Sequence, residues 1–186
     1  NKEYSSQKEL DEYIRISAEK AEQLRTMSDK MFRYFYVYSK GGEDLNMEMF
    51  PAGPFLDQML GEYVVLLGEN GYQFDIDISD KEAEIYVDLQ GMKRITDNVF
   101  TNIRKYSDKS KTIDIRVYID RRKVRIYFRN YINPEGGKAE STHIGTLTCQ
   151  KMAEEMNGSF TTCRKGKVYE ATLTLPNMLD NDDSHV

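Results

Sequence analysis

The sequence has little that would place the chain in a membrane or on a polyanion. No apolar run is long enough to span a bilayer, and the chain does not open with a signal-peptide pattern. Positive charge is not in excess, because 26 Lys and Arg residues stand against 31 Asp and Glu residues and the two signs are mixed along the chain. This balance argues against nucleic acid as a partner and against binding to a membrane surface.

Cysteine is scarce as well. Cys149 and Cys163 are the only two, and their spacing is not that of a metal site. In a reducing compartment such cysteines behave as small hydrophobic residues, so we expect a cytoplasmic chain. Its 186 residues are enough for one core of ordinary size and an appendage, but not for two complete domains.

A long helix is predicted over residues 8–38, because apolar and small residues recur there at alternating spacings of four and three. This heptad seam consists of Leu10, Ile14, Ser17, Ala21, Leu24, Ser28, Met31, Phe35 and Tyr38. At 1.5 Å per residue the helix would be about 45 Å long. Such a seam needs partners, and we favour an intermolecular bundle over a helix folded back on its own domain. Lys40, Gly41 and Gly42 then predict a hinge and a domain boundary near residue 41.

The rest of the chain alternates short strands with helices, which indicates an α+β fold. Helices are predicted over residues 55–69, 91–107 and 145–156, the last one ending at Asn157 and Gly158. Strands are predicted over 45–50, 72–78, 83–87, 112–119, 123–131, 160–164 and 169–175, with a turn at 51–54. We expect 72–78 to pair with 83–87 as a hairpin, a mixed sheet overall, and helices on one face.

The helix over residues 91–107 carries polar residues where a surface helix does not need them. Asp88 is a suitable N-cap, and a core-facing stripe is formed by Ile95, Val99, Ile103 and Tyr106. Asn98, Asn102 and Lys105 form a second stripe, rotated by roughly 100° and therefore at the boundary of core and solvent. Asn is a poor helix former, so these side chains indicate the lining of a cleft; a plain solvated face is the alternative.

The segment NVFTNIRKYS, residues 98–107, resembles the N box of the GHKL ATPases, and most closely that of the sensor histidine kinases. The resemblance implies a Bergerat-type two-layer α/β sandwich, with a mixed sheet and three helices, that binds ATP and Mg²⁺. In it, Asn102 would be a Mg²⁺ ligand and Asn98 a second contact to the metal and phosphates. Lys105 would neutralise phosphate charge, and Tyr106 would form a wall beside the nucleotide. An amide oxygen suits Mg²⁺, which prefers oxygen ligands.

Two other boxes of the family are altered. Where the family has an Asp that accepts a hydrogen bond from the adenine amino group, this chain has Asn130, followed by Tyr131, Ile132 and Asn133 instead of glycines. An amide still accepts that bond, but without a charge. The family's second box offers backbone N–H groups and a helix N-terminus to the phosphates. The matching positions are Thr142, His143, Ile144, Gly145 and Thr146, of which only Gly145 keeps its glycine.

His143 stands where the family favours glycine, so its β-carbon is predicted to crowd a phosphate or strain the loop. The imidazole itself would be a phosphate ligand, a second phosphoacceptor or a solvated loop histidine. His143 and His185 are the only histidines of the chain, and neither lies in a heptad helix. The family's phosphoacceptor histidine is therefore expected outside this chain.

The helix over 8–38 resembles the second helix of the dimerisation and phosphotransfer hairpin of histidine kinases. The resemblance divides the chain into a partial phosphotransfer helix (1–40), an ATP-binding domain (41–176) and a disordered acidic tail (177–186). It implies a cytoplasmic fragment of a membrane-anchored protein histidine kinase, a homodimer through the helix, and a response regulator receiver domain as partner. The alternatives are a degenerate pseudokinase acting as a dimerising scaffold, or another GHKL protein such as an anti-sigma serine kinase or a chaperone-type ATPase.

Overall fold

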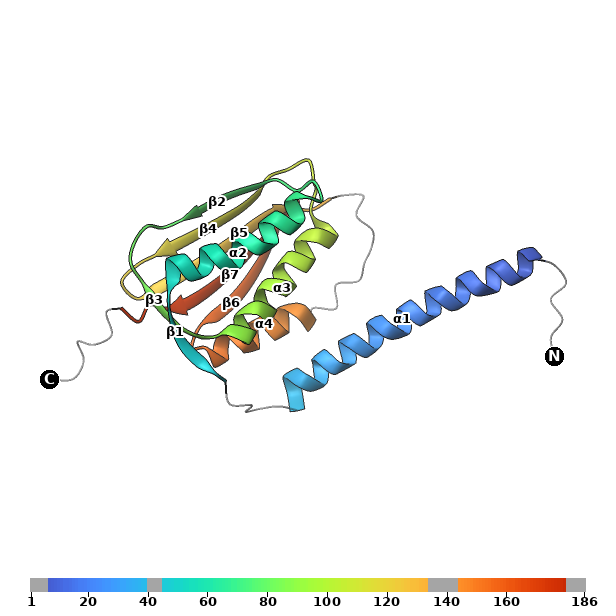
Figure 1. Cartoon of the computed structure of the whole chain (residues 1–186), viewed down its shortest axis with the longest axis horizontal. Helices are drawn as coiled ribbons and strands as arrows, with labels where there is room; N and C mark the ends of the chain where they lie inside the picture. The colour runs from blue at the N-terminus through green and yellow to red at the C-terminus, as the bar shows by residue number, and fades with distance from the viewer. Residues whose placement is uncertain (1–6, 40–44, 134–143, 180–186) are drawn as a thin grey trace. The chain divides into compact units, whose positions relative to one another are not determined.

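The computed structural model describes residues 7–39, 45–133 and 144–179. It separates the chain into two compact units, Asn1–Glu43 and Asp44–Val186. The first unit contains helix α1 (Gln7–Ser39), which agrees with the helix predicted over residues 8–38 (Figure 1). Ile14, Leu24 and Met31 of its heptad seam are exposed. Burying these side chains against partner helices would remove apolar surface from water.

The second unit contains a five-stranded sheet. In spatial order its strands are β2 (Phe74–Ile78), β4 (Ile113–Ile119), β5 (Lys123–Tyr131), β7 (Val168–Pro176) and β6 (Ser159–Lys165). The β2–β4 pair is parallel and the other pairs are antiparallel, so the sheet is mixed, as predicted. Two further strands, β1 (Met47–Pro51) and β3 (Glu84–Asp88), form a separate antiparallel pair.

The predicted hairpin of residues 72–78 with 83–87 is wrong. Both segments are strands, but β2 pairs with β4 and β3 pairs with β1. The connection between them, SDKE, lacks the glycine or Asn-Gly pair that a tight hairpin turn requires. The backbone instead continues along β4, because Ser79 N donates to Val117 O at 3.1 Å. Alternation identified the strands but not their partners.

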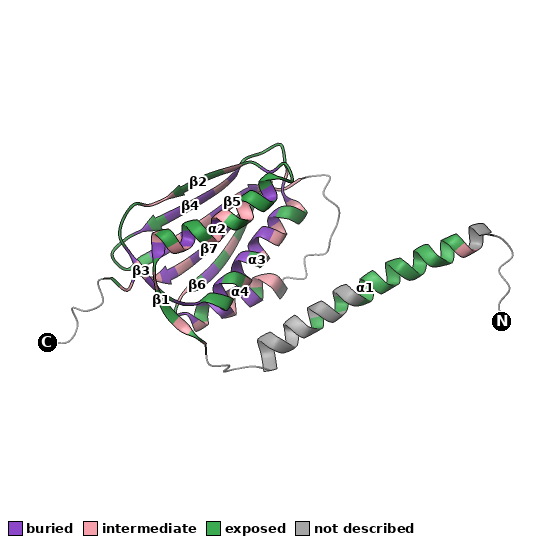
Figure 2. Cartoon of the chain, in the orientation of Figure 1, coloured by how far each residue is buried: buried purple, intermediate pink, exposed green. Residues whose placement is uncertain are grey.

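Three helices, α2 (Ala52–Gly68), α3 (Leu89–Tyr106) and α4 (Ile144–Glu155), cover the same face of the five-stranded sheet (Figure 1). Every second residue of the central strands is buried under them (Figure 2). These core residues are Ile113, Ile115, Val117, Val124, Ile126, Phe128, Ala171, Leu173 and Leu175. This is the predicted two-layer α+β architecture.

Helix α2 departs from the sequence prediction in two ways. The turn predicted over 51–54 is helical from Ala52 onward, since Pro54 lies in the first turn, where a missing N–H costs no helical hydrogen bond. The buried residues are Ala52, Leu56, Leu60 and Leu67, whereas Leu66, an equally apolar residue of the same helix, is 57% exposed. The helix is apolar on more than one side, so its pattern does not define the buried face.

The C-terminus of α4 forms the predicted left-handed stop, with Asn157 at φ 57°. Gly158 N donates to Ala153 O at 2.7 Å. Gly158 is needed for space, because a β-carbon there would lie 2.3 Å from the backbone oxygen of Thr174 in β7. The two residues thus close the helix in different ways, one by its φ and the other by its lack of a side chain.

Replacing Gly158 by alanine is expected to lower the free energy of unfolding by about 1–3 kcal/mol, because a backbone oxygen has to move. Asn157→Gly is the matched control, since glycine adopts the left-handed conformation readily and should leave stability nearly unchanged. Urea unfolding followed by circular dichroism measures both. Equal stability of G158A and the parent chain would contradict the close packing of α4 on β7.

The chain remains part of the domain for three residues beyond β7, where the sequence prediction placed the start of a tail. Asn177 is buried, its Oδ1 accepts from Glu84 N at 3.2 Å and its Nδ2 donates to Asp120 O at 3.0 Å. Met178 N also donates to Glu84 O at 2.8 Å. Asn177 and Met178 are therefore bonded to the domain, which extends beyond the predicted boundary at residue 176. None of the described helices is both long and apolar enough to cross a membrane.

Candidate functional site

Helix α3 is held in a defined rotation by its cap and by its buried stripe. The Asp88 carboxylate accepts from Gly91 N at 2.5 Å and from Asn46 N at 3.0 Å, which confirms the predicted N-cap. Ile95, Val99 and Ile103 are buried, as predicted, and Tyr106 is half-buried. The second stripe consequently lies at the edge of the core, with Asn98 and Asn102 half-buried and Lys105 exposed.

The first residue of the polar stripe lies against the beginning of α4. Asn98 Nδ2 donates to Arg94 O of its own helix at 2.9 Å. A β-carbon built on Gly145 would lie 3.0 Å from Asn98 Oδ1, so this oxygen faces the first turn of α4. The two helices run antiparallel, since a β-carbon on Gly91 would lie 3.7 Å from the sulfur of Met156 at the other end of α4. The structure thus brings Asn98 and Gly145 together.

The last residues of α3 are joined to the end of β5. Asn133 N donates to Tyr106 O at 2.8 Å, and Asp108 N donates to Tyr131 O at 2.7 Å. The end of β5 therefore lies beside Tyr106, and the start of α4 lies beside Asn98. Asn98, Asn102 and Lys105 lie along α3 between these two points. Two amides and an ammonium thus follow one another along the side of α3 that runs from the start of α4 to the end of β5.

Thr142 and His143 lie outside the described residues, and so does the loop of residues 134–143 as a whole. Ile144 is the first residue of α4, but its side chain is not described. The assignment of these three residues to a phosphate site remains a prediction. Gly145 and Thr146 are placed, and both are half-buried in the first turn of α4.

Asn130 occupies the inner face of β5 near its end and is only 4% exposed. Its neighbour in the sheet is Tyr169 of β7. Burial raises the pKa of Tyr169 above its usual value, although hydrogen bonds with Thr162 and Thr146 act in the opposite direction. Tyr169 therefore links the sheet beside Asn130 to the first turn of α4. Within residues 45–133 and 144–179, no hydrogen bond joins the Asn130 side chain to another residue.

A buried amide offers both a donor and an acceptor, and such groups are normally satisfied. The assignment of Asn130 to the recognition of adenine remains a prediction. Sequence reasoning missed Tyr169. Strand alternation could have found it, because Tyr169 shares the inner face with Ala171 and Leu173.

The cysteines have the structural character that the sequence indicates. Cys149 is buried in α4 with its sulfur 3.9 Å from Ile95 O, and burial raises the pKa of its thiol to about 12. Cys163 is exposed on β6. Among the described residues, no cluster of three or more His, Cys, Asp or Glu side chains is placed to hold a metal ion.

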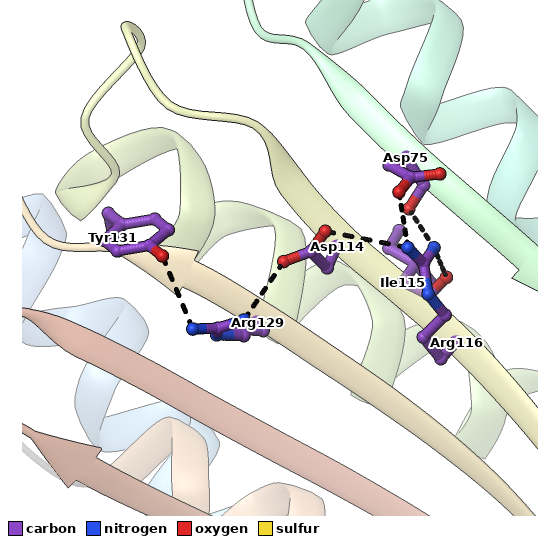
Figure 3. Close-up of polar contacts among 6 residues, drawn as sticks. All are labelled: Asp75, Asp114, Ile115, Arg116, Arg129 and Tyr131. Atoms are coloured by element: carbon purple, nitrogen blue, oxygen red, sulfur yellow. Dashed lines mark hydrogen bonds and ion pairs between the residues drawn. The ribbon is translucent and has the colours of Figure 1, made fainter.

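The opposite face of the sheet carries a separate polar network (Figure 3). Arg116 bonds Asp75 across the β2–β4 pair, and this contact holds the pKa of Asp75 below its usual value. Asp114 lies 3.8 Å from Arg116 and 3.7 Å from Arg129, and Arg129 donates to the Tyr131 hydroxyl at 3.4 Å. These residues connect three strands on the face that the helices leave open, so they take no part in the α3 site.

No protein-family model matches this sequence. The sensor histidine kinase YrkQ of Bacillus subtilis (strain 168) is 27% identical over 163 residues, which is 88% of this chain and 37% of that protein. The chain thus spans 37% of the length of this relative.

Solved structures agree with that similarity. The histidine kinase AdeS of Acinetobacter baumannii superposes with a TM-score of 0.63 at 12% identity, over 95% of this chain and 87% of the other. The nucleotide-free catalytic domain of the histidine kinase ThkA gives a TM-score of 0.58 at 18% identity, over 70% of this chain and 99% of that domain. The second unit has the fold of a histidine kinase catalytic domain. The resemblance to histidine kinases that rests on residues 98–107 is therefore confirmed for the fold.

A third histidine kinase structure includes a nucleotide analogue. Full-length ShkA in complex with AMPPNP superposes on 95% of this chain, covers 40% of its own length, and gives a TM-score of 0.65 at 14% identity. The chain therefore resembles both a nucleotide-free histidine kinase structure (ThkA) and one with a bound nucleotide analogue (ShkA).

Proposed function

We propose that this histidine kinase catalytic domain binds ATP with Mg²⁺ between α3, the first turn of α4, the end of β5 and the start of β7. The observation that carries the proposal is the position of Asn98, whose Oδ1 faces Gly145 at the start of α4. Free backbone N–H groups at a helix N-terminus and neutral amide oxygens on the facing helix are complementary to a metal-bound triphosphate.

Each residue of the polar stripe has its own role in the proposal. Asn102 supplies an oxygen ligand to Mg²⁺, and the phosphates and water complete the shell, so that no acidic cluster is required. Asn98 contacts the metal and phosphate group, while the exposed Lys105 neutralises phosphate charge. The first turn of α4, with Ile144, Gly145 and Thr146, receives the phosphates, as do Thr142 and His143 of the preceding loop.

The base is proposed to lie toward Asn130, with Tyr106 forming a wall of the site. The Asn130 oxygen would accept a hydrogen bond from the adenine amino group, and its Nδ2 can donate to a ring nitrogen. Burial strengthens such bonds, because water does not compete for the same groups. The amide lacks the charge that the family's carboxylate provides, so the base contact is weaker than in relatives with Asp.

In the proposed reaction this domain holds and orients Mg-ATP, and the γ-phosphoryl group passes to a histidine outside this chain. A response regulator receiver domain would then accept the group on an aspartate. The contribution of this domain is positioning and charge neutralisation, which are the main sources of catalysis in phosphoryl transfer. The proposal includes homodimerisation through α1, whose seam residues Ile14, Leu24 and Met31 are exposed, and a membrane-anchored parent protein.

A scaffold that binds nucleotide weakly or not at all is the second candidate. The specific observation in its favour is Asn130, which places a neutral amide where the family has a carboxylate. In this case the fold would persist as a dimerising interaction module, or pseudokinase.

Thermal unfolding in the presence of ADP and Mg²⁺ separates the two candidates. A ligand at about a hundred times its Kd adds roughly 2.7 kcal/mol to stability, which raises the melting temperature. We expect a rise with ADP and Mg²⁺ and a much smaller one when EDTA removes the metal. An unchanged melting temperature at millimolar nucleotide would support the scaffold and contradict ATP binding.

Replacing Asn130 by aspartate is expected to tighten ADP binding by up to about tenfold, because a charged acceptor makes hydrogen bonds roughly twice as strong as a neutral one. The same change should destabilise the ligand-free chain, because it buries a carboxylate in place of an amide. Calorimetric titration and thermal unfolding measure the two effects. If N130D binds ADP more weakly than the parent chain, Asn130 does not contact the adenine amino group.

A further inference from the structure

Cationic side chains gather at one end of the second unit, where α3, β5 and β6 end and β4 and β7 begin. They come from the end of α3, from the loop of residues 107–112 and from the turn between β6 and β7. This basic end consists of Arg104, Lys109, Lys111, Arg164, Lys165 and Lys167, all exposed. None of these residues belongs to the polar stripe of α3.

Contacts with Tyr72 hold the first part of the basic end together. The Tyr72 hydroxyl donates to Arg104 O at 2.8 Å, and the Lys109 ammonium lies 4.9 Å from the centre of the Tyr72 ring. Lys109 Nζ also donates to Asn70 O at 3.0 Å. The Arg104 backbone and the Lys109 ammonium therefore both contact Tyr72, at the place where α2 and α3 both end.

Backbone hydrogen bonds place the β6–β7 turn beside the same loop. Ile132 N donates to Lys167 O at 2.7 Å, and Asp108 N donates to Tyr131 O at 2.7 Å. Hydrogen bonds from Ser110, together with the nearby charges of Lys111 and Lys167, hold the pKa of Asp108 below its usual value. Lys111 and Lys167, far apart in sequence, are thus neighbours around one carboxylate.

The charge of this end contrasts with that of the whole chain, which carries a net charge of −5. Glu69 and Asp108 are the acidic residues of the described loops and turns at this end, against the six cations of the basic end, while Asp75, Asp114 and Glu170 lie on the adjoining strands. Such separation of charge creates a local positive potential that attracts and orients an acidic partner. A long polyanion or a membrane would also meet the acidic remainder of the molecule, whereas a short acidic segment would not.

We propose that the basic end is a docking surface for an acidic segment of a partner protein. The surface adjoins the proposed nucleotide site, since Lys167 O accepts from Ile132 N two residues after Asn130, but none of its six cations belongs to that site. Its cations are carried on long exposed stems, which adapt to a carboxylate-rich segment without a preformed pocket. The interaction should weaken as salt increases, because exposed charges are screened.

The full chain is titrated into a fluorescein-labelled peptide of about eight Asp and Glu residues, and binding is followed by fluorescence anisotropy at about 0.05 M and 0.15 M salt. The variant Lys111→Glu/Lys167→Glu is expected to bind at least about tenfold more weakly than the parent chain. The control Lys81→Glu/Lys123→Glu makes the same change of charge at exposed positions at the other end of the sheet. It should change the affinity less than about threefold.

Three results would overturn the proposal: no binding of the peptide by the parent chain, equal losses in both double variants, or tighter binding of duplex DNA or phosphatidylserine vesicles than of the peptide. Circular dichroism and thermal unfolding confirm that each variant is folded. The Lys111→Glu/Lys167→Glu variant should also keep the full thermal shift with ADP and Mg²⁺. Loss of that shift together with peptide binding would show that the two surfaces are not separate.

Discussion

Replacing Asn102 by alanine is expected to weaken binding of Mg-ADP by about 10–100-fold, because the variant lacks the proposed amide ligand of the metal. Asn102 is half-buried on α3, one turn after Asn98, whose Oδ1 faces the start of α4. Binding of ADP without Mg²⁺ should change little, since the lost contact is to the metal. Calorimetric titrations with and without Mg²⁺ measure both constants.

The control is Gln90→Ala, which removes an amide from an exposed position in the first turn of the same helix. Q90A should bind Mg-ADP as the parent chain does. Equal affinity of N102A and Q90A for Mg-ADP would rule out Asn102 as a metal ligand. A loss by N102A that is the same with and without Mg²⁺ would point to a contact with the nucleotide instead.

The largest loss of stability is expected for Phe100→Ala, about 3–5 kcal/mol. Phe100 is 3% exposed on the inner side of α3. Its ring stacks on Tyr63 of α2 with centroids 4.6 Å apart, and packs edge-on against Phe128 of β5 at 6.0 Å. Phe74 of β2 lies 6.2 Å away. The truncation leaves a cavity between two helices and the sheet, so the midpoint of thermal unfolding should fall by more than about 8 °C.

Leu66→Ala is the matched control, because Leu66 is a large apolar residue on α2 that is 57% exposed. Its replacement should change the free energy of unfolding by less than about 0.5 kcal/mol. Similar losses in F100A and L66A would mean that α2 and α3 present other faces to the sheet. In that case the rotation of α3 would be different, and Asn98 would not face the start of α4.

The parts of the fold that the sequence predicts well are those with a clear period. Helix α3 has one apolar stripe, so Ile95, Val99 and Ile103 define its buried side, and the position of the polar stripe follows. Helix α2 is apolar on more than one side, and the exposure of Leu66 could not be deduced from its pattern. A period identifies a buried face only when the other face is polar.

Strand pairing could not be predicted from the sequence, for a different reason. Residues 72–78 and 83–87 alternate equally well in either pairing, and the choice depends on distant partners. β3 is held by β1 and by Asn177, which lies 93 residues after Glu84. A contact between residues so far apart in the sequence cannot be predicted from the local pattern of polar and apolar residues.

The candidate site was predicted in part. Asn98, Asn102, Lys105, Tyr106, Asn130, Gly145 and Thr146 are placed by the structure, and the apposition of Asn98 and Gly145 could not be seen in the sequence alone. It arises because α3 and α4 run antiparallel, so that residues 47 positions apart become neighbours. The sequence did not predict that Tyr169 lies at the candidate site. It lies there because it pairs with Asn130 in the sheet and forms a hydrogen bond with Thr146.

The central claim is that the polar stripe of α3 holds the metal of a bound nucleotide. Paramagnetic Mn²⁺ in place of Mg²⁺ tests it directly in the ¹⁵N-labelled chain with ADP. The side-chain NH₂ signals of Asn98 and Asn102 should broaden beyond detection. The signal of Gln90, about 12 Å from Asn98 and about 18 Å from Asn102 along the helix at 1.5 Å per residue, should broaden much less. Sharp signals from both asparagines in the presence of Mn-ADP would contradict the claim.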